Sequence, residues 1–299
     1  MDRFHQMQVF VAVAEDAGFA AAARRLRLSP PAVTRAVAAL EEQLGVKLLN
    51  RTTRTVRATE AGLRYLEDAR RILLEVASAD EAAAGINAEP RGHLAVTAPV
   101  LFGRMFVMPG ILEYLEQYPQ VEVSAVFLDR VVNLLEEGLD VAIRIGELAD
   151  SSMRALRVGT VRHILCAAPD YLQRHGLPQQ PEDLSRHTLI ASSAGSGDPH
   201  WRFHQRQTDR ALRISPRLTT STNDAAVEAA VGGLGITRLL SYQVAPHLAA
   251  GALKILLENF ETPPLPVHIV HRQGRHAAVK VRAFIDLLAQ RLRGEKALN

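Results

Sequence analysis

The residues of this chain best suited to bind a charged partner lie close together near its N-terminus. Ser29, Thr34 and Arg35 carry hydroxyl and guanidinium groups at the start of one segment, and arginines follow at positions 51, 54 and 57. Hydroxyls and guanidinium groups bind phosphates and base edges, which are the two kinds of contact that proteins make with DNA. The spacing therefore predicts a nucleic-acid-binding segment.

A second set of polar residues follows predicted strands in the C-terminal two thirds of the chain. Three short runs are involved, Thr97-Ala98-Pro99, Arg144-Ile145-Gly146 and Thr222-Asn223. Ligands of open α/β sheets lie beyond the carboxyl ends of strands, where helix N-termini and a cation suit a small carboxylate. A structural role is the alternative for each run, with Thr97 and Thr222 capping helices and Arg144 in an ion pair.

The positive charge of the protein is concentrated at its N-terminal end. The whole chain has a formal net charge of +3. Residues 1–58 carry nine Lys and Arg against five Asp and Glu, whereas residues 59–299 carry 26 against 27. A local basic segment on an otherwise balanced chain favours a polyanionic partner.

Length and composition limit the class of protein. At 299 residues, with 47% hydrophobic and 22% charged residues, the chain fits a globular protein of two or three domains. No apolar run approaches the roughly 18 residues that span a bilayer, and the first residues lack a secretory-signal pattern. We therefore expect a cytoplasmic protein with no membrane partner. The single cysteine, Cys166, excludes an internal disulfide and a cysteine-based zinc site.

The sequence contains no motif of a catalytic or cofactor-binding site. Gly232-Gly233-Leu234-Gly235 lacks the strand and spacing of a dinucleotide fingerprint, and residues 192–197 lack a nucleophile elbow. His200 and His204 are four residues apart, but the residues between them predict a strand, which would separate them too far for one metal ion. We expect no catalytic residue, no metal and no cofactor.

Three helices are predicted to position the first set of polar residues. Apolar residues recur at helical spacing over residues 7–14, and an alanine-rich segment at 19–26 forms a second short helix. Ser29 then caps a third helix with prolines in its first turn. At about 100° per residue, one face of this helix is apolar and the opposite face is that of a recognition helix. The apolar face comprises Val33, Val37, Leu40 and Leu44, and the opposite face Pro31, Thr34, Arg35 and Ala38.

A hairpin is predicted after the third helix. Two β-prone stretches within residues 46–59 flank a polar turn that carries the three spaced arginines. Such a hairpin forms a wing whose arginines bind phosphate or enter the minor groove. The alternative is a three-helix bundle with a solvated basic hairpin.

These residues resemble the DNA-binding signature of LysR-type transcriptional regulators. The resemblance is carried by Phe19-x-x-Ala22-Ala23-x-x-Leu26-x-Leu28-Ser29-x-x-Ala32-Val33-Thr34-x-x-Val37-x-x-Leu40-Glu41-x-x-Leu44-Gly45-x-x-Leu48-Leu49-x-Arg51 and continues through Arg54-x-Val56-x-Ala58-Thr59-x-Ala61-Gly62. It implies a winged helix-turn-helix over residues 1–59. The residues expected to contact DNA are Ser29, Pro30, Pro31, Thr34, Arg35, Asn50, Arg51, Thr52 and Arg54.

Two positions depart from the family pattern. Gly18 stands where serine is common, and it is a weaker N-cap for the second helix. Pro30 stands where glutamine or serine is common and removes a potential polar contact to DNA. The base preference of a relative therefore does not transfer to this chain.

A long helix is predicted over residues 60–89. Its apolar residues are spaced alternately four and three apart, at Tyr65, Ala69, Ile72, Val76, Ala79, Ala83 and Ile86. This heptad pattern favours pairing of two chains, although burial against the chain's own C-terminal domain is the alternative. The family resemblance implies a linker helix that joins two winged domains in a homodimer or in a homotetramer built as a dimer of dimers.

From residue 90 onward, predicted strands and helices alternate, which is typical of α/β architecture with a mostly parallel sheet. Strands are expected near 93–97, 121–128, 140–145, 162–168 and 267–271, and helices near 105–117, 131–137 and 279–293. The runs 98–103, 136–146 and 232–236 resemble the co-inducer domain of the same family. That resemblance implies two Rossmann-like subdomains, similar to a type 2 periplasmic binding protein, over residues 91–161 with 269–299 and over 162–268.

The resemblance also implies a small organic, anionic effector in the cleft between the subdomains. The residues expected to contact it are Thr97, Ala98, Pro99, Phe102, Arg144, Gly146, Thr222 and Asn223. The sequence thus predicts a regulator that binds double-stranded promoter DNA under effector control. The alternative is an α/β enzyme or solute-binding module with an appended basic domain, although no catalytic motif supports it.

Overall fold

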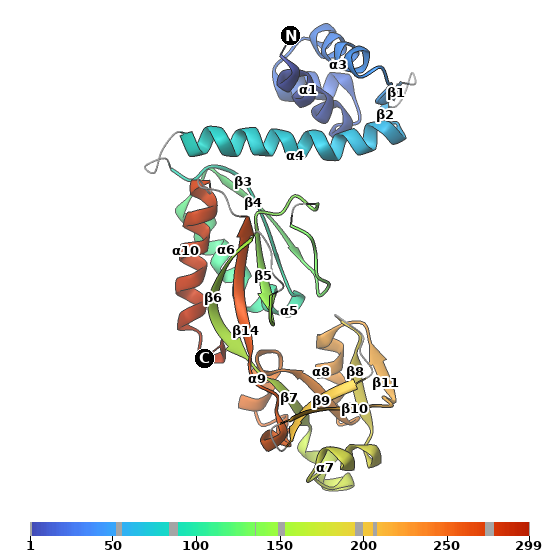
Figure 1. The fold of residues 1–299 in the computed structure, drawn as a ribbon, viewed down its shortest axis with the longest axis vertical. Helices are drawn as coiled ribbons and strands as arrows, with labels where there is room; N and C mark the ends of the chain where they lie inside the picture. The colour runs from blue at the N-terminus through green and yellow to red at the C-terminus, as the bar shows by residue number, and fades with distance from the viewer. Residues whose placement is uncertain are drawn as a thin grey trace. The chain divides into compact units, whose positions relative to one another are not determined.

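The chain divides into two units, Met1–Ala88 and Glu89–Asn299. The computed structural model describes residues 2–51, 56–83, 89–134, 136–148, 153–194, 200–205, 208–272 and 278–298. Within these residues, the first unit contains four helices and a hairpin, and the second is an α/β structure with two five-stranded sheets and a two-stranded hairpin (Figure 1). The predicted fold class is confirmed.

The N-terminal unit contains α1 (Arg3–Glu15), α2 (Phe19–Leu26), α3 (Pro30–Leu44), the hairpin strands β1 (Leu49–Arg51) and β2 (Val56–Ala58), and α4 (Glu60–Ala83). Apolar residues at helical spacing on the first three helices form one buried cluster. Ala22 and Ala23 of α2 are fully or almost fully buried, and their small side chains let the helices approach closely. Gly45 ends α3 with a positive φ of 66°, a conformation that glycine adopts without steric cost.

The start of α4 lies directly against the chain that leads into the hairpin. The Thr59 hydroxyl donates to the Lys47 carbonyl oxygen (2.8 Å) and accepts from the Gly62 N–H (2.9 Å). A Cβ atom at Gly62 would lie 2.0 Å from the Leu48 carbonyl oxygen. Only glycine fits this contact, because the atom in the way belongs to the backbone.

We expect Gly62→Ala to lower the free energy of unfolding by about 1–3 kcal/mol, since α4 must shift away from Leu48. The matched control is Leu63→Ala at the adjacent, 56% exposed position, where we expect a change within about 0.5 kcal/mol. Urea unfolding of the full chain measures both. Equal stability of the two variants would contradict the close packing at Gly62.

Part of the predicted apolar stripe of α4 is buried within the N-terminal unit. Tyr65 packs on Phe10 of α1 with ring centroids 5.6 Å apart, and Ala69 is fully buried. Arg70 forms an ion pair with Glu15 of α1 at 2.8 Å. Tyr65 therefore contacts the chain's own α1, a partner that neither the predicted pairing of two chains nor its alternative, the C-terminal domain, included. A heptad pattern specifies an apolar face but not the surface that covers it.

The rest of the predicted stripe is described only in part. Ile72 and Val76 are half-buried within the N-terminal unit. The side chains of Ala79 and Ala83, together with Ile86, lie outside the described residues. Among the helices that the structure describes, none is long and apolar enough to cross a membrane.

The first subdomain of the second unit is a five-stranded sheet in the order β4-β3-β5-β14-β6. Its strands are β3 (Gly92–Ala98), β4 (Val121–Phe127), β5 (Val141–Ile145), β6 (Met153–Val161) and β14 (Leu265–Arg272). Strand β3 is parallel to β4 and β5, whereas β14 is antiparallel to β5 and β6.

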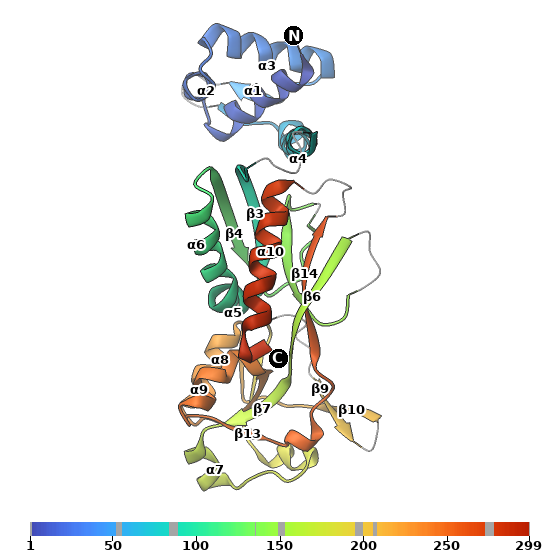
Figure 2. The same ribbon diagram turned by 90° about the vertical axis from the view of Figure 1, so that its left-hand side faces the viewer.

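One face of this sheet is covered by helices from distant parts of the chain. They are α5 (Val100–Phe102), a π-helical turn (Gly103–Val107), α6 (Met108–Gln117) and α10 (Val279–Gly294), followed by a 3₁₀ turn at Lys296–Leu298. Helices α6 and α10 pack side by side (Figure 2), where the Tyr114 hydroxyl donates to the Lys280 carbonyl oxygen at 2.7 Å. The predicted stripe of α10 is buried in this core.

The second subdomain is a five-stranded sheet in the order β11-β8-β12-β7-β13. Its strands are β7 (His163–Ala167), β8 (Leu189–Ser192), β11 (Leu218–Thr220), β12 (Ile236–Leu240) and β13 (Lys254–Leu256). One face packs with α8 (Asn223–Val231) and α9 (Ser241–Ala249). The other packs with α7 (Pro169–His175), two 3₁₀ helices (Pro181–Arg186 and Glu258–Phe260) and the hairpin of β9 (His200–Gln205) and β10 (Thr208–Arg213).

The chain crosses between the two sheets twice. Strand β6 ends at Val161 and β7 begins at His163, which places the first crossing where it was expected. Strand β14 of the first sheet begins at Leu265, opposite Val161. The predicted boundary between residues 268 and 269 therefore falls inside a strand. Prolines at 263, 264 and 266 concealed the start of β14, because proline is unusual within sheets.

The helix predicted over residues 131–137 is wrong. The described residues of this range form turns or irregular structure. Val132 and Leu134 are buried with Ala95 and Ala142 on the second face of the first sheet. Their burial satisfies the apolar pattern without a helix.

Candidate DNA-binding surface and effector cavity

Helix α3 presents two different faces, as its sequence predicted. Val33, Val37 and Leu40 are completely buried. Pro31 and Arg35 are exposed on the opposite side, and Ala38 is exposed one turn further along. The exposed face begins at the positive end of the helix dipole and carries small side chains beside one guanidinium, as recognition helices do.

The hydroxyls at the start of α3 differ in their bonding. Ser29 has extended N-cap dihedral angles (φ −74°, ψ 145°) but makes no side-chain capping bond, and it is exposed. The Thr34 hydroxyl donates to the Pro30 carbonyl oxygen at 3.0 Å. The Ser29 hydroxyl is therefore available to a ligand, whereas Thr34 retains only its acceptor positions and its methyl group for that purpose.

Several arginines of this unit lack an internal counter-charge. Arg24, Arg27 and Arg35 are exposed and form no ion pair within the part of the chain that the structure describes. Arg25 differs, because it contacts Glu15 at 3.0 Å and Asp16 at 3.3 Å. These three arginines give the surface of the unit a positive charge, which is the electrostatic feature of proteins that bind a DNA backbone.

Glu41 is a structural residue that the sequence analysis did not identify. Its side chain is buried, and Oε1 accepts from the Leu48 N–H (2.9 Å) and the Leu49 N–H (3.1 Å), while Oε2 contacts Lys47 Nζ (2.9 Å). Burial raises the pKa of this carboxyl, but the hydrogen bonds from Lys47, Leu49 and Leu48 outweigh it and hold the pKa below its usual value. Glu41 thus connects α3 by hydrogen bonds to the start of the first hairpin strand.

The predicted wing is an antiparallel hairpin. Asn50 lies opposite Arg57 in its register, and both are exposed. The two side chains therefore stand next to each other on one face. Thr52, Arg54 and the Arg51 side chain belong to the predicted contact set but lie outside the described residues.

The second unit contains a cavity of about 350 Å³ lined by both subdomains, which we name the effector cavity. Five of the residues predicted to contact an effector line it, namely Thr97, Ala98, Pro99, Arg144 and Asn223. Thr97 and Ala98 end β3 and Pro99 follows it, Arg144 lies in β5, and Asn223 begins α8 of the second subdomain. The rule that ligands of α/β sheets lie beyond the carboxyl ends of strands therefore selected residues that are more than 100 positions apart in the sequence but line one cavity.

The other three predicted residues do not line this cavity. Phe102 is fully buried against Phe106 and Tyr242, with ring centroids 4.9 and 5.3 Å away. Gly146 has a φ of 108° and donates its N–H to the Pro266 carbonyl oxygen at 2.9 Å. Thr222 occupies the N-cap position of α8, although its side chain makes no capping hydrogen bond. Core packing, a turn and a helix cap account for the three positions.

Arg144 is the main cationic group predicted for the effector. Burial lowers the pKa of its guanidinium, and the charge of Glu137 acts in the opposite direction. Arg144 donates to the Val132 carbonyl oxygen and forms no ion pair with any described residue. Thr97, by contrast, donates its hydroxyl to the Val126 carbonyl oxygen at 2.7 Å, so its polar atom already has a structural partner.

The effector cavity also includes polar residues that the sequence analysis missed. Asp129 accepts from the Val100 N–H at 3.1 Å, and Arg130 pairs with Glu137 at 2.7 Å. Burial and the charge of Arg238 lower the pKa of His163 to about 3, so its ring is neutral at physiological pH. His163 is the first residue of β7, directly after the chain crosses between the two sheets. The predicted position of that crossing could therefore have indicated that His163 lies at the cavity.

No group of three or more potential metal ligands occurs in the described part of the chain. His200 and His204 lie at opposite ends of β9, as the sequence predicted. His204 instead contacts Asp209 of β10 at 2.8 Å.

Two family descriptions match the chain. Residues 4–63 match the bacterial regulatory helix-turn-helix protein of the lysR family, and residues 87–293 match the LysR substrate binding domain. Together these matches cover both units of the structure.

Known proteins of similar length agree with these matches. The chain is 33% identical over 288 residues to the transcriptional regulator CrgA of Neisseria meningitidis serogroup B, covering 96% of each chain. It is 32% identical over 288 residues to the transcriptional activator AaeR of Escherichia coli K12, covering 96% of this chain and 93% of AaeR.

Solved structures give the same result. The structure of CrgA from Neisseria meningitidis has a TM-score of 0.63 at 33% identity, covering 97% of this chain and 99% of CrgA. The virulence activator AphB of Vibrio cholerae has a TM-score of 0.64 at 27% identity, covering 97% and 99%. CrgA and AaeR are named transcriptional regulators, which sets the enzyme alternative aside. The chain therefore belongs to the LysR family of transcriptional regulators and is a DNA-binding regulator with a substrate-binding domain rather than an enzyme.

Proposed function

We propose that this regulator binds promoter DNA as a homo-oligomer and that a small organic anion in the effector cavity changes its DNA affinity. The proposed effector control is supported by one observation. Both subdomains line the cavity, the first with Arg144 and the second with Asn223. A ligand that contacts both subdomains favours one relative placement of them and so shifts a conformational equilibrium.

The DNA contacts follow from the exposed face of α3. Arg35 and Ser29 would reach base edges or phosphates in the major groove, and Pro31 and Ala38 would allow close approach. Thr34 would contribute through its acceptor positions and methyl group. Asn50, Arg51, Thr52 and Arg54 of the hairpin would contact the adjacent backbone or minor groove.

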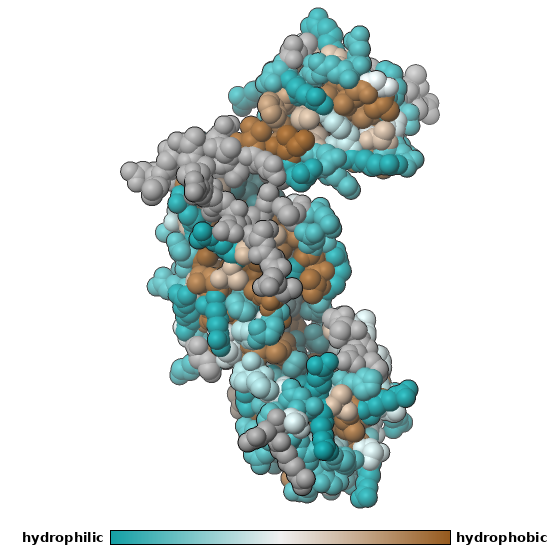
Figure 3. Space-filling model, in the orientation of Figure 1, coloured by the Kyte–Doolittle hydropathy of each residue, from teal (hydrophilic) through white to brown (hydrophobic). Residues whose placement is uncertain are grey.

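Oligomerisation would place two such helices on separated half-sites. The N-terminal unit leaves apolar side chains exposed, including Phe4 (43%) and Leu63 (56%), and apolar areas are visible on its surface (Figure 3). These groups, with α4, are available to a second chain. We place the regulator in the cytoplasm, where a bacterial promoter lies.

The anionic character of the effector rests on Arg144. A carboxylate in the cavity would give this guanidinium an ion pair in a partly desolvated setting, where charge-assisted hydrogen bonds are strong. Asn223, at the first turn of α8, would add an amide donor beside the positive end of a helix.

The proposal is tested by screening small metabolite anions for an increase in the thermal stability of the full chain, then measuring promoter binding with each positive compound. A compound at one hundred times its Kd should stabilise the protein by about 2.7 kcal/mol. We expect Arg144→Gln to reduce or abolish this increase. Arg154→Gln, an exposed arginine of β6 that does not line the cavity, should retain it. A ligand-induced increase that is undiminished in Arg144→Gln would reject the assigned role.

A further inference from the structure

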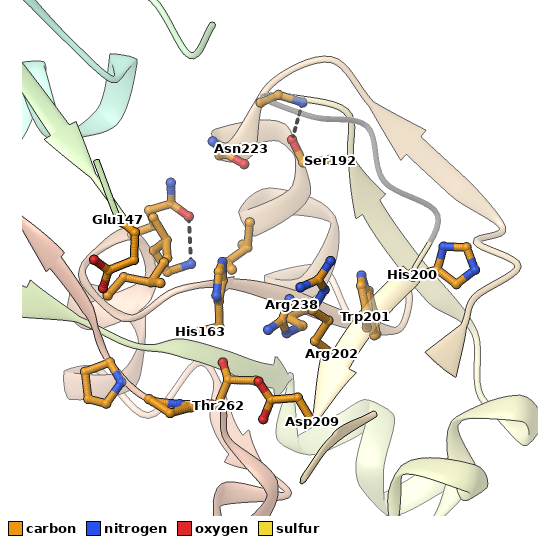
Figure 4. Close-up of a pocket in the computed structure, with 17 residues that line it drawn as sticks. Glu147, His163, Ser192, His200, Trp201, Arg202, Asp209, Asn223, Arg238 and Thr262 are labelled. Atoms are coloured by element: carbon orange, nitrogen blue, oxygen red, sulfur yellow. Dashed lines mark hydrogen bonds between the residues drawn. The ribbon is translucent and has the colours of Figure 1, made fainter. Parts of the chain in front are cut away.

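A second cavity of about 720 Å³ adjoins the effector cavity and shares six lining residues with it. Residues found only in the larger cavity include Arg202 of β9 and Arg238 of β12. Both arginines lie near Trp201 in the close-up view (Figure 4). Neither arginine belongs to the set of residues that the family pattern suggested.

The second sheet positions Arg238 at the edge of its apolar core. Ile236 is buried under the β9–β10 hairpin, and alternation along a strand places Arg238 on the same face. On the neighbouring strand, Leu165 lies opposite Arg238 and belongs to the same buried cluster. The face therefore changes from apolar to cationic where the cavity begins.

Among the residues that the structure describes, none supplies a direct counter-charge to the Arg238 guanidinium. No ion pair or side-chain hydrogen bond joins it to a residue that the structure describes. Burial and, to a smaller extent, the charge of Arg202 lower the pKa of Arg238 to about 10, with Glu261 acting in the opposite direction. The Glu261 carboxylate is itself paired with Arg162 at 2.9 Å. Arg238 is partly buried and Arg202 is exposed. A partly desolvated cation beside a second cation is destabilised unless an anion compensates it.

The acidic groups of the cavity do not provide this compensation. Asp209 contacts His204 at 2.8 Å, and Glu147 is exposed to solvent. In Figure 4, His163 lies between Glu147 and the two arginines. His163 is neutral at physiological pH, because its pKa lies near 3.

We propose that Arg202 and Arg238 form a second anion-binding site, which holds the carboxylate or phosphate group of a small organic molecule. Two guanidinium groups supply the forked donors that such oxyanions accept. Pro263, Pro264 and Leu265 also line the cavity and would contact the apolar part of the molecule. This site goes beyond the proposed effector function, because Arg144 does not line it.

The sole tryptophan of the chain provides a local probe, since Trp201 lines this cavity. The experiment titrates the full-length protein with succinate and, separately, with inorganic phosphate, each against sodium chloride at equal ionic strength. We expect a saturable change in Trp201 fluorescence with at least one of them, and the anion that gives it identifies the preferred head group. Arg238→Gln should weaken that binding by about tenfold or more.

Two control variants separate this site from its surroundings. Arg210→Gln removes an exposed charge from the same hairpin and should bind as the wild type does. Arg144→Gln should also retain the fluorescence response, so the outcome does not depend on the proposed effector role of Arg144. The absence of a saturable change with both anions would overturn the proposal. Unchanged anion affinity in Arg202→Gln would also overturn it. This second variant tests the proposal if Arg238→Gln does not fold.

Discussion

Arg35→Ala is expected to weaken binding of the full-length regulator to its promoter DNA by about 1–3 kcal/mol, which is roughly 5-fold to 150-fold in affinity. The physical reason is the position of Arg35 on the exposed face of α3, without an internal ion pair among the described residues. Its removal costs hydrogen bonds to DNA and no contact that stabilises the fold. Fluorescence anisotropy with a labelled promoter fragment measures the change.

The salt dependence of the same titration distinguishes two roles for Arg35. If it contacts a base edge, the loss is largest on the specific site. If it contacts a phosphate, the loss is similar on all sequences, and the slope of log K against log salt decreases by about 1. Arg64→Ala is the matched control, because Arg64 is exposed on α4 and pairs with Glu60. Wild-type affinity in Arg35→Ala on both specific and unrelated DNA would reject the α3 surface.

Glu41→Ala is expected to lower the free energy of unfolding by about 2–5 kcal/mol. The substitution leaves the N–H groups of Leu48 and Leu49 without the carboxylate that accepts from them and removes the contact with Lys47. DNA binding should fall as well, since α3 and the hairpin lose their direct connection. Chemical unfolding of the full chain provides the measurement.

Two further variants show whether the carboxylate charge matters. Glu41→Gln keeps one oxygen acceptor and should lose less stability than Glu41→Ala. Glu42→Ala, at the exposed neighbouring position, should change stability by less than about 0.5 kcal/mol. If Glu41→Ala and Glu42→Ala were equally stable, Glu41 would not connect the two elements.

The stability contribution of Glu41 should also depend on pH. Its pKa is lowered in the folded chain, so the unfolded chain takes up the proton more readily. The contribution is complete above the unfolded pKa, about 4.3, and is lost as the pH falls through the lower folded value. The difference in stability between the wild type and Glu41→Gln should therefore shrink on acidification. A difference that stayed constant down to about pH 3 would contradict this assignment.

Most of the DNA-binding unit was predictable because its signals are local. The turn at Leu28-Ser29-Pro30-Pro31 and the spacing of Val33, Val37 and Leu40 determine where α3 begins and which face it buries. The hairpin and the α/β class also followed from short patterns. The return crossing was misplaced, because the prolines before β14 conceal a strand that a distant partner, β6, completes.

The effector cavity was only partly predictable. The positions of strand ends selected Thr97 and Arg144, which line it, but also Gly146, which forms a backbone hydrogen bond to Pro266 instead. The family resemblance added Phe102, which lies in the core against Tyr242. A strand end gives a position along the chain and says nothing of the direction in which a side chain points. It could not reveal Arg238, whose surroundings depend on the hairpin folded over the second sheet.

The sequence by itself thus determined the basic, hydroxyl-bearing segment near the N-terminus, its place on a recognition helix, and the family to which that signature belongs. Periodicity and capping act within a few residues, so they can be recognised without a fold. Only the tertiary structure decided that Glu41 is buried and bonded to the hairpin, that Tyr65 packs on Phe10 of α1, and that no described residue pairs with Arg238. These outcomes depend on which surfaces meet, and a helical or strand period specifies a face but not its partner.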